Sequence, residues 1–159
     1  MNRIDGKVAV ITGGTQGLGA AIANLFAEAG AHGIVIVGRD HKKGEIVASE
    51  ISKAYGVRAK MIAADLEKIE DVQRIIAETD NIFGRVDILV NSAGLTDRGN
   101  ILDTNPDLFN RMIAVNTRAP FFLIQDAAKI MIRENIEGRI VNIGSVSYTH
   151  LTLPTKEEV

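Results

Sequence analysis

The amino-acid sequence predicts an α/β fold in which helices cover both faces of a doubly wound parallel sheet. Short runs rich in β-branched residues alternate along the chain with longer segments of helical periodicity. The apolar runs are nearly continuous, which is typical of strands that are buried on both faces. A glycine-rich turn follows the first run directly and leads into a helical segment. We therefore expect one domain over residues 1–145.

Each element of the expected fold has its own pattern. The expected strands are KVAVI at 7–11, GIVIV at 33–37, RAKMIAA at 58–64, VDILVN at 86–91 and GRIVNIG at 138–144. The expected helices span 17–30, 41–55, 66–83 and 106–134. Gly30 and Gly84 are typical helix ends, and Asn105 followed by Pro106 predicts an N-cap with proline at the first helical position.

The composition argues against several kinds of site. The chain has 159 residues and no cysteine, so it has neither a disulfide nor a thiolate metal site. His32, His41 and His150 lack metal-ligand spacing, so we expect them on the surface and expect no metal site. The 18 Lys and Arg against 20 Asp and Glu, without a basic block, indicate neither a nucleic-acid partner nor a membrane partner. The N-terminal segment resembles neither a signal peptide nor a membrane span, so we expect a cytoplasmic protein.

The stretch TGGTQGLG, from Thr12 to Gly19, lies between the first expected strand and a helix of small residues. Glycines at a helix start let a pyrophosphate approach the exposed N–H groups. The spacing of Gly13, Gly17 and Gly19 is G-x-x-x-G-x-G rather than the common dinucleotide pattern G-x-G-x-x-G. The alternative interpretation is a turn in which glycines merely let two elements pack closely. The strand and helix on either side favour anion binding.

The same stretch resembles the TGxxxGxG loop of the short-chain dehydrogenase/reductase family, and further matches follow it in order. These matches are Asp65 with Leu66 at the adenine contact, NSAG at 91–94 for the family's NNAG, Asn116 for its active-site asparagine, and IVNIGS ending at Ser145 for its catalytic serine. Ser92 is a mismatch within one motif. The resemblance implies a Rossmann-type, NAD(P)-binding domain with strand order 3-2-1-4-5, truncated after the fifth strand.

The resemblance also implies which residues form the site. The residues expected to bind the dinucleotide are Thr12, Gly13, Gln16, Gly17, Leu18, Gly19, Arg39, Asp65, Leu66, Asn91, Ala93 and Gly94. The residues expected to take part in catalysis are Ser145 and Asn116. Ligands of open α/β sheets bind beyond the carboxyl ends of the strands, so we expect these residues to line one crevice.

Arg39 bears on the choice of cofactor. It follows the second expected strand in VGRD, where Gly38 replaces the acidic residue that would hydrogen-bond the adenosine ribose. A guanidinium there suits a 2′-phosphate, so NADP(H) is favoured and NAD(H) is the alternative. Arg39 would otherwise be an ordinary exposed arginine, since Gln16 adds no second positive charge in the glycine loop.

Three of the site residues also have structural interpretations. Asp65 is expected to be a turn or cap residue before the following helix, to contact adenine, or to do both. Asn91 is alternatively a buried residue that satisfies neighbouring backbone groups. Asn116 interrupts an apolar helical stretch, and a buried amide without a partner costs about 1 to 3 kcal/mol, so we expect it to have one. In the family that partner is a helix carbonyl and a water of the proton relay.

The chemistry implied by the resemblance is hydride transfer between a nicotinamide and a carbonyl or alcohol substrate. The proton is handled by a serine and by a tyrosine whose pKa is lowered by a lysine at Y-x-x-x-K spacing. Ser145 fits the serine, but the residues four beyond Tyr55 and Tyr148 are alanine and threonine. We therefore expect the chain as written to lack the proton donor and to be inactive.

Residues 146–159 have neither helical period nor strand register. VSYTHLTLPT, at 146–155, also matches the translation of a transposon-end adapter used in sequencing libraries. We expect a non-native tail here, with natural splicing or a divergent end as alternatives. The strand at 138–144 would then have a bare edge, and the chain as written would be poorly soluble or self-associating. The completed enzyme is expected to be a homo-oligomer, a dimer or a tetramer.

Two function classes follow from these patterns. The first is an oxidoreductase acting on a small-molecule carbonyl or alcohol, and the second is a dinucleotide-binding module without chemistry, such as a redox-sensing regulator. A methyltransferase on a similar sheet is disfavoured, because it would not explain Asn116 or IVNIGS. The substrate stays open among steroids, sugars, polyols and acyl thioesters.

Overall fold

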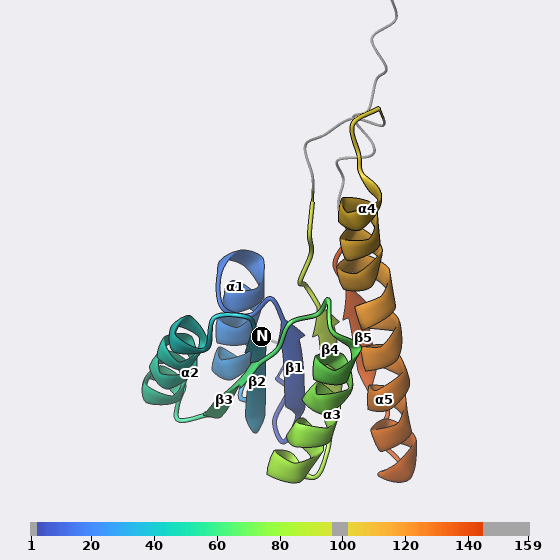
Figure 1. Ribbon diagram of the computed structural model, residues 1–159. Coiled ribbons are helices and arrows are strands. Elements are labelled where there is room, and N and C mark those ends of the chain that lie inside the picture. Colours follow the sequence, from blue (N-terminus) through green and yellow to red (C-terminus); the bar gives the residue numbers. More distant parts are fainter. Residues whose placement is uncertain (1–2, 97–101, 145–159) are drawn as a thin grey trace, which may run out of the picture.

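The computed structural model describes residues 3–96 and 102–144. Within these ranges, five strands form one parallel sheet in the order β3-β2-β1-β4-β5 (Figure 1). The strands are β1 (Val8–Thr12), β2 (Gly33–Gly38), β3 (Arg58–Ala63), β4 (Ile88–Asn91) and β5 (Arg139–Asn142). The predicted fold class and strand order are confirmed.

The helices connect these strands as the sequence predicts. They are α1 (Gly17–Glu28), α2 (His41–Tyr55), α3 (Ile69–Phe83), α4 (Pro106–Ile113) and α5 (Ala119–Arg133), with the π-helical turn η1 (Ala114–Arg118) between the last two. The side chain of Asn105 caps α4 by accepting a hydrogen bond from the N–H of Leu108 at 2.9 Å, and Pro106 follows it. Gly84 is the C-cap of α3. These local predictions are confirmed.

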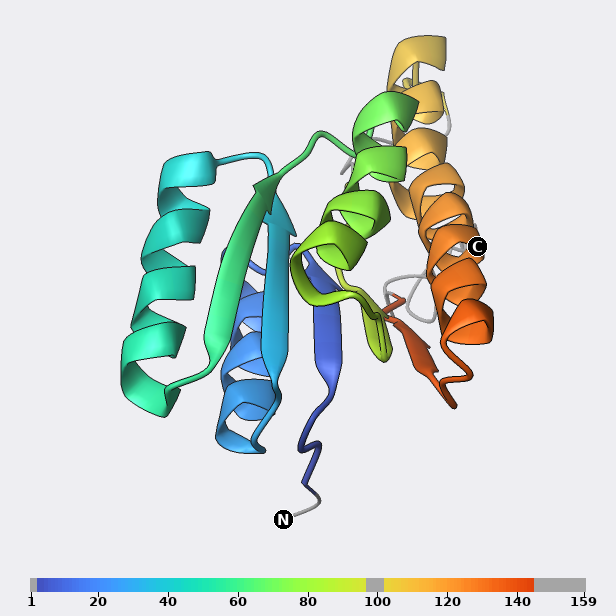
Figure 2. The same ribbon diagram turned by 90° about the horizontal axis from the view of Figure 1, so that it is seen from below.

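The sheet separates two helical layers. Helices α1 and α2 cover one face, and α3 and α5 cover the other (Figure 2). Along β2, Ile34 and Ile36 pack with the first layer, whereas Val35 and Val37 pack with the second. All four side chains are fully buried, which explains why the sequence of this strand is continuously apolar.

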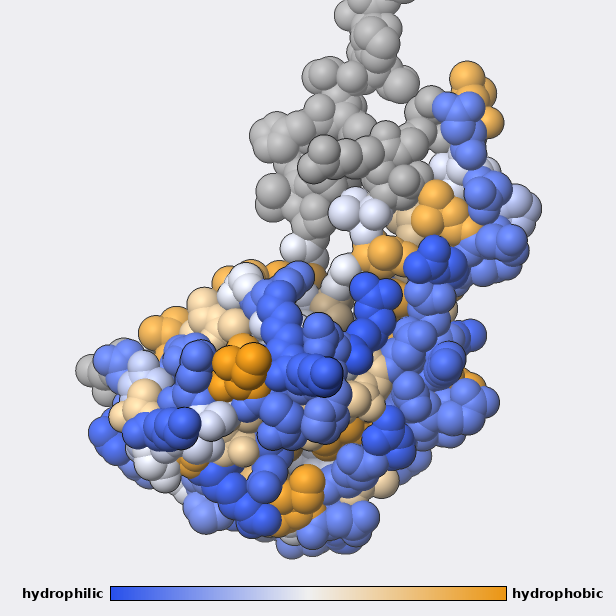
Figure 3. Space-filling model, turned by 60° about the vertical axis from the view of Figure 1, so that its left-hand side comes forward, coloured by the Kyte–Doolittle hydropathy of each residue, from blue (hydrophilic) through white to orange (hydrophobic). Residues whose placement is uncertain are grey.

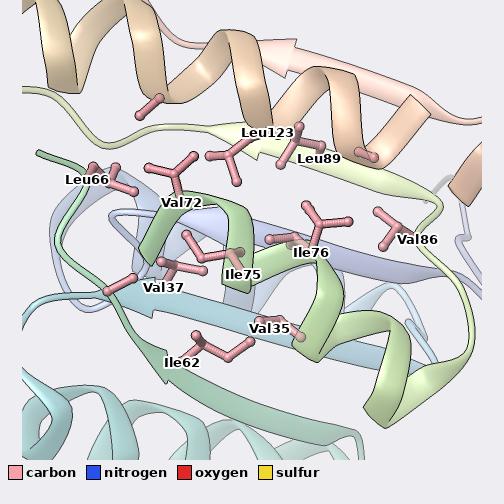
Figure 4. Packing of buried hydrophobic residues seen from close by; sticks show 14 of the residues in the cluster. Val35, Val37, Ile62, Leu66, Val72, Ile75, Ile76, Val86, Leu89 and Leu123 are labelled. Carbon is pink, nitrogen blue, oxygen red and sulfur yellow. The ribbon is translucent and has the colours of Figure 1, made fainter. Parts of the chain in front are cut away.

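Apolar side chains of α3 and α5 fill the space over the centre of the sheet (Figure 4). Helix α3 contributes Val72, Ile75 and Ile76, and α5 contributes Leu123 among others. Burying one such side chain stabilises the fold by about 1.5 to 3 kcal/mol. The helical period of the apolar residues in α3 therefore fixes which side of this helix meets the sheet.

The start of α3 differs from the expectation. The helix begins at Ile69 rather than at 66 and its N-cap is Lys68, so the interpretation of Asp65 as the helix cap is wrong. The N–H of Asp65 donates to the carboxylate of Asp71 at 2.8 Å, and the Asp65 carboxylate accepts from the N–H of Glu67 at 3.1 Å. These polar contacts form a turn ahead of the helix and leave Asp65 free of a capping role.

The last described strand, β5, is the least covered strand of the sheet. All of its residues are exposed, with 38% of Ile140 and 42% of Val141 accessible. Burial of the other strands is nearly complete except for alternate residues at the outer strand β3. The sheet is therefore well covered by helices at its centre and poorly covered at β5.

Several sequence predictions concern residues outside the described ranges. Ser145, Tyr148, His150 and the expected tail at 146–159 belong to this group. His32 and His41 are exposed, as predicted. No helix within residues 3–96 and 102–144 has the length and apolar character needed to span a membrane. Polar side chains predominate on the face seen in Figure 3, and apolar ones lie between them in separate patches.

Candidate functional site

A cleft of about 390 Å³ lies beyond the carboxyl ends of β1, β2 and β3, where open α/β sheets bind ligands. The sequence-predicted residues that line it are Gly13, Gln16, Gly17, Leu18, Gly19, Arg39, Asp65, Leu66, Ala93 and Gly94. Thr12 and Asn91 do not line the cleft, because both are buried beneath it. Folding thus brings together segments that are far apart in the sequence.

The glycine turn is packed too closely for side chains at two of its positions. A Cβ atom on Gly19 would lie 2.4 Å from the carbonyl oxygen of Gly13, a contact that the backbone cannot relieve locally. Gly13 has a φ of 70°, and a Cβ atom there would lie 3.0 Å from the backbone of Ala93. Because α1 begins at Gly17 without a side-chain cap, its first N–H groups and positive end face the cleft. This geometry suits an anion, and we call the turn from Gly13 to Gly19 the glycine cradle.

Thr12 joins the glycine turn to the loop after β4. Its hydroxyl oxygen accepts hydrogen bonds from the N–H groups of Ser92 and Ala93, both at 3.1 Å. The hydroxyl therefore fixes two walls of the cleft relative to each other without reaching the cleft itself.

Asn91 supports the next pair of strands. Its side-chain amide donates to the Asn142 side-chain oxygen at 2.8 Å, so β4 and β5 are joined by side chains as well as by backbone. The expectation that Asn91 satisfies backbone groups is not what the geometry shows. Its own side-chain oxygen is buried and has no hydrogen-bond partner among the residues that the structure describes.

Asn116 lies in the π-helical turn η1 and is exposed, so the expectation of a buried amide is wrong. Within the same turn, Ala114 is buried. Its side-chain oxygen accepts from the N–H of Leu95 at 2.8 Å, and its side-chain nitrogen donates to the Leu95 carbonyl at 2.7 Å. The partner is thus the loop after β4 rather than a helix carbonyl, and Asn116 fixes Leu95 at the cleft wall.

Arg39 lines the cleft beyond β2 and is exposed. Its guanidinium makes no hydrogen bond or ion pair with any residue in the described ranges, although its charge contributes to lowering the pKa of the Glu67 carboxyl. Arg39 is therefore free to bind an anion in the cleft.

Glu67 is a cleft residue that sequence reasoning did not identify. The Arg111 guanidinium contacts both of its carboxylate oxygens at 3.0 Å, and the Arg118 side chain donates to its backbone carbonyl. The hydrogen bonds from Arg111 hold the pKa of the Glu67 carboxyl below its ordinary value. Arg111 lies 44 residues away in the sequence, so no local pattern could have indicated the contact.

Asp71 supports the turn before Glu67, although it does not line the cleft itself. The hydrogen bond from the Asp65 N–H lowers the pKa of the Asp71 carboxyl, and Arg74 lowers it further. The ionised carboxylate holds the turn that carries Asp65 and Leu66 into the cleft. No group of three or more His, Asp or Glu side chains suited to a metal ion occurs in the described part of the chain.

This chain has relatives of similar sequence over most of its length. The family model for short chain dehydrogenases matches residues 7–151. Versicolorin reductase 1 of Aspergillus parasiticus is 40% identical over 140 residues, which are 88% of this chain and 52% of that protein. The 3-oxoacyl-[acyl-carrier-protein] reductase of Aquifex aeolicus is 35% identical over 144 residues, 91% of this chain and 57% of that protein. The chain spans about half the length of the curated relatives it matches.

Solved structures of other proteins are similar to this fold. A metagenomic short-chain oxidoreductase in complex with NADP matches with a TM-score of 0.83 and 36% identity, covering 91% of this chain and 64% of that one. A short chain dehydrogenase from Burkholderia cenocepacia in complex with NADP matches with a TM-score of 0.85 and 35% identity, covering 96% and 60%. The sheet order, the glycine cradle and these matches agree: the chain belongs to the short-chain dehydrogenase/reductase family.

Proposed function

We propose that the whole protein is an oxidoreductase that uses NADP(H) in preference to NAD(H) and acts on a carbonyl or alcohol substrate. The observation that carries this proposal is the combination of a glycine cradle and an unpaired Arg39 guanidinium in one cleft, as far as the described residues extend. Two solved relatives are described as complexes with NADP, which supports the same cofactor here.

The described residues fit a dinucleotide. The backbone of Gly13 to Gly19 suits the pyrophosphate, because α1 begins at Gly17 without a side-chain cap and its first N–H groups are available to an anion. We propose that Asp65 and Leu66 contact the adenine and that Arg39 binds the 2′-phosphate, and their common place in the cleft lining supports this. When bound, the nicotinamide supplies the hydride that the reaction transfers.

Asn116 and Ser145 are the catalytic residues that we propose within this chain. Asn116 holds the Leu95 backbone at the cleft wall, so its proposed contribution is to position the substrate side of the site. Ser145 would hydrogen-bond the substrate oxygen. The 159 residues contain no Y-x-x-x-K pair, so this chain by itself is proposed to bind the cofactor without turning over a carbonyl substrate.

The whole protein is also proposed to be a homo-oligomer. Exposed apolar side chains on α4 and α5, namely Phe109, Ile113 and Phe121, support this proposal. Apolar residues of this size on helix surfaces are typical of protein interfaces.

A binding module without chemistry is the second candidate, because the described cleft by itself accounts for dinucleotide binding alone. The sequence of the gene on both sides of this stretch distinguishes the two. A Y-x-x-x-K motif soon after Ser145 would favour the enzyme, and a native stop after residue 159 would favour the binding module.

Calorimetric titration of the chain with NADPH and NADH tests the proposed cofactor. We expect tighter binding of NADPH, and we expect Arg39→Asp to weaken NADPH binding by about tenfold or more while changing NADH less, since charged hydrogen bonds contribute about 1.5 to 3 kcal/mol. Arg139→Asp is the matched control, because Arg139 is exposed at the opposite end of the sheet. Equal effects of Arg39→Asp on both nucleotides would contradict the preference, and failure of the unmodified chain to bind either would contradict the function.

A further inference from the structure

Lys43 lies in the first turn of α2, beside the cleft but not in its lining. Its backbone is fixed, because its N–H donates to the Asp40 side chain at 3.0 Å in the N-cap of α2. Its side chain reaches the glycine turn, because the ammonium donates to the side-chain oxygen of Gln16. Gln16 itself lines the cleft.

The glycine turn packs directly on the end of β2. A Cβ atom on Gly38 would lie 2.7 Å from the Thr15 methyl group, so these two segments are in contact. This contact places Gln16, and with it the Lys43 ammonium, on the side of the cleft where Arg39 leaves β2. Two cations therefore flank one end of the cleft.

The charge of Lys43 is not neutralised by a carboxylate. Among the described residues, its side chain hydrogen-bonds only the neutral amide of Gln16. The neighbouring acidic groups are engaged elsewhere: Asp40 caps the helix, Glu45 faces His41 at 3.7 Å, and Glu67 is held by Arg111. The first turn of α2 contains no acidic residue, although acidic residues are the ones that a helix N-terminus favours.

We propose that Lys43 is a specificity-determining residue and provides the second cation for the 2′-phosphate of NADP(H), together with Arg39. Gln16 holds the ammonium at the edge of the cleft, and a phosphate monoester bound by Arg39 replaces the amide as its partner. The inference deepens the proposed function and rests on it. Gln16 carries no positive charge itself, as the sequence indicates, but it binds the ammonium of Lys43 from α2 and so brings a second charge to the glycine turn.

A purely structural role is the competing explanation. In that case the Lys43 to Gln16 hydrogen bond only joins α2 to the glycine turn, and its loss would weaken all adenine nucleotides alike. Replacement of lysine by glutamine separates the two roles, because the amide of glutamine still donates a hydrogen bond but carries no charge.

The test is calorimetric titration of the chain with 2′,5′-ADP and with 5′-AMP, which differ by the 2′-phosphate. We expect Lys43→Gln to raise the Kd of 2′,5′-ADP by about fivefold or more and to leave that of 5′-AMP within about twofold. Lys43→Arg should preserve the preference for 2′,5′-ADP, because it keeps the charge. Lys42→Gln is the matched control, since it removes a charge from the same helical turn at a residue that does not bond Gln16.

The possible outcomes separate this inference from the proposed function. If the unmodified chain prefers 2′,5′-ADP but Lys43→Gln changes both affinities equally or neither, the inference is overturned and the proposed function stands. An effect of Lys42→Gln as large as that of Lys43→Gln would also overturn it, because the contribution would then be unspecific. If the unmodified chain binds neither ligand, the proposed function fails first.

Discussion

Strands β2 and β5 have similar apolar sequences, GIVIVG and RIVN, but very different environments. In β2, Ile34 and Val35 are fully buried, whereas in β5, Ile140 and Val141 are more than one third exposed. Residue type therefore predicts that a segment is a strand but does not predict how well it is covered. Coverage depends on whether helices pack on both faces. Residues of β2 belong to both hydrophobic clusters of the protein, whereas, within the described residues, no residue of β5 belongs to either.

The helices show the same contrast. Helix α3 buries Val72, Ile75, Ile76 and Thr79, whereas α4 buries none of its residues. The described contacts that hold α4 and η1 to the rest of the protein include polar ones, from Arg111 to Glu67 and from Asn116 to Leu95. The candidate cleft thus lies between the closely packed sheet and the segment formed by α4 and η1, whose contacts include hydrogen bonds and ion pairs.

The largest predicted effect concerns the covered strand. Ile36→Ala in β2 removes a fully buried side chain and should lower the free energy of unfolding by about 2 to 5 kcal/mol. Ile140→Ala in β5 is the matched control and should cost less than about 1.5 kcal/mol, because its side chain is partly solvated already. Urea denaturation of the two variants checks this prediction, and equal costs would show that β5 is covered in solution.

A second prediction concerns the buried carboxylate of Asp87, which is 2% exposed at the amino end of β4. Burial alone would raise the pKa of this carboxyl, but the Arg85 guanidinium, the Val8 N–H and the Lys7 ammonium outweigh burial and lower it below 3.8. Asp87→Asn should therefore cost about 1.5 to 3 kcal/mol at neutral pH, as expected for hydrogen bonds to a charged group.

The pH dependence of this effect follows from the lowered pKa. The stabilisation is fully present above the unfolded-state value of 3.8 and is lost as the pH falls through the lower folded-state pKa. Urea denaturation of both proteins from pH 7 to pH 2.5 measures the difference, which should shrink below about pH 4. A difference that stayed constant over that range would contradict an ionised Asp87.

The smallest predicted effect concerns η1, which Asn116 joins to the loop after β4 by polar contacts. Asn116→Ala removes two hydrogen bonds to the Leu95 backbone at an exposed position, so global stability should change by about 1 kcal/mol or less. The local effect should be clearer, because the Leu95 amide loses its hydrogen-bond acceptor and should exchange its hydrogen several-fold faster. Hydrogen exchange of Leu95 in both proteins tests this, with a buried β1 amide such as that of Val10 as the unaffected reference.

Much of the site was predictable because its parts are local in the sequence. The glycine turn, Arg39 after β2 and Asp65 after β3 each follow a strand, and parallel strands bring their carboxyl ends to one edge. Errors arose where the environment of a residue depends on distant segments. The apolar neighbours of Asn116 in the sequence suggest a buried amide, but in the structure Asn116 lies in η1 and is exposed, where it bonds the backbone of Leu95, 21 residues away.

Apolar periodicity, glycine positions and caps act over a few residues, so the strands, the helices and their order could be predicted from one sequence. The contacts between distant segments are known only from the folded chain: Thr12 with Ser92, Glu67 with Arg111, and Lys43 with Gln16. These pairs are separated by 80, 44 and 27 residues, and polar side chains at such distances carry no mutual pattern in one sequence. They meet because hydrophobic burial on both faces of the sheet fixes where each strand ends, and the polar groups at those ends then find their partners.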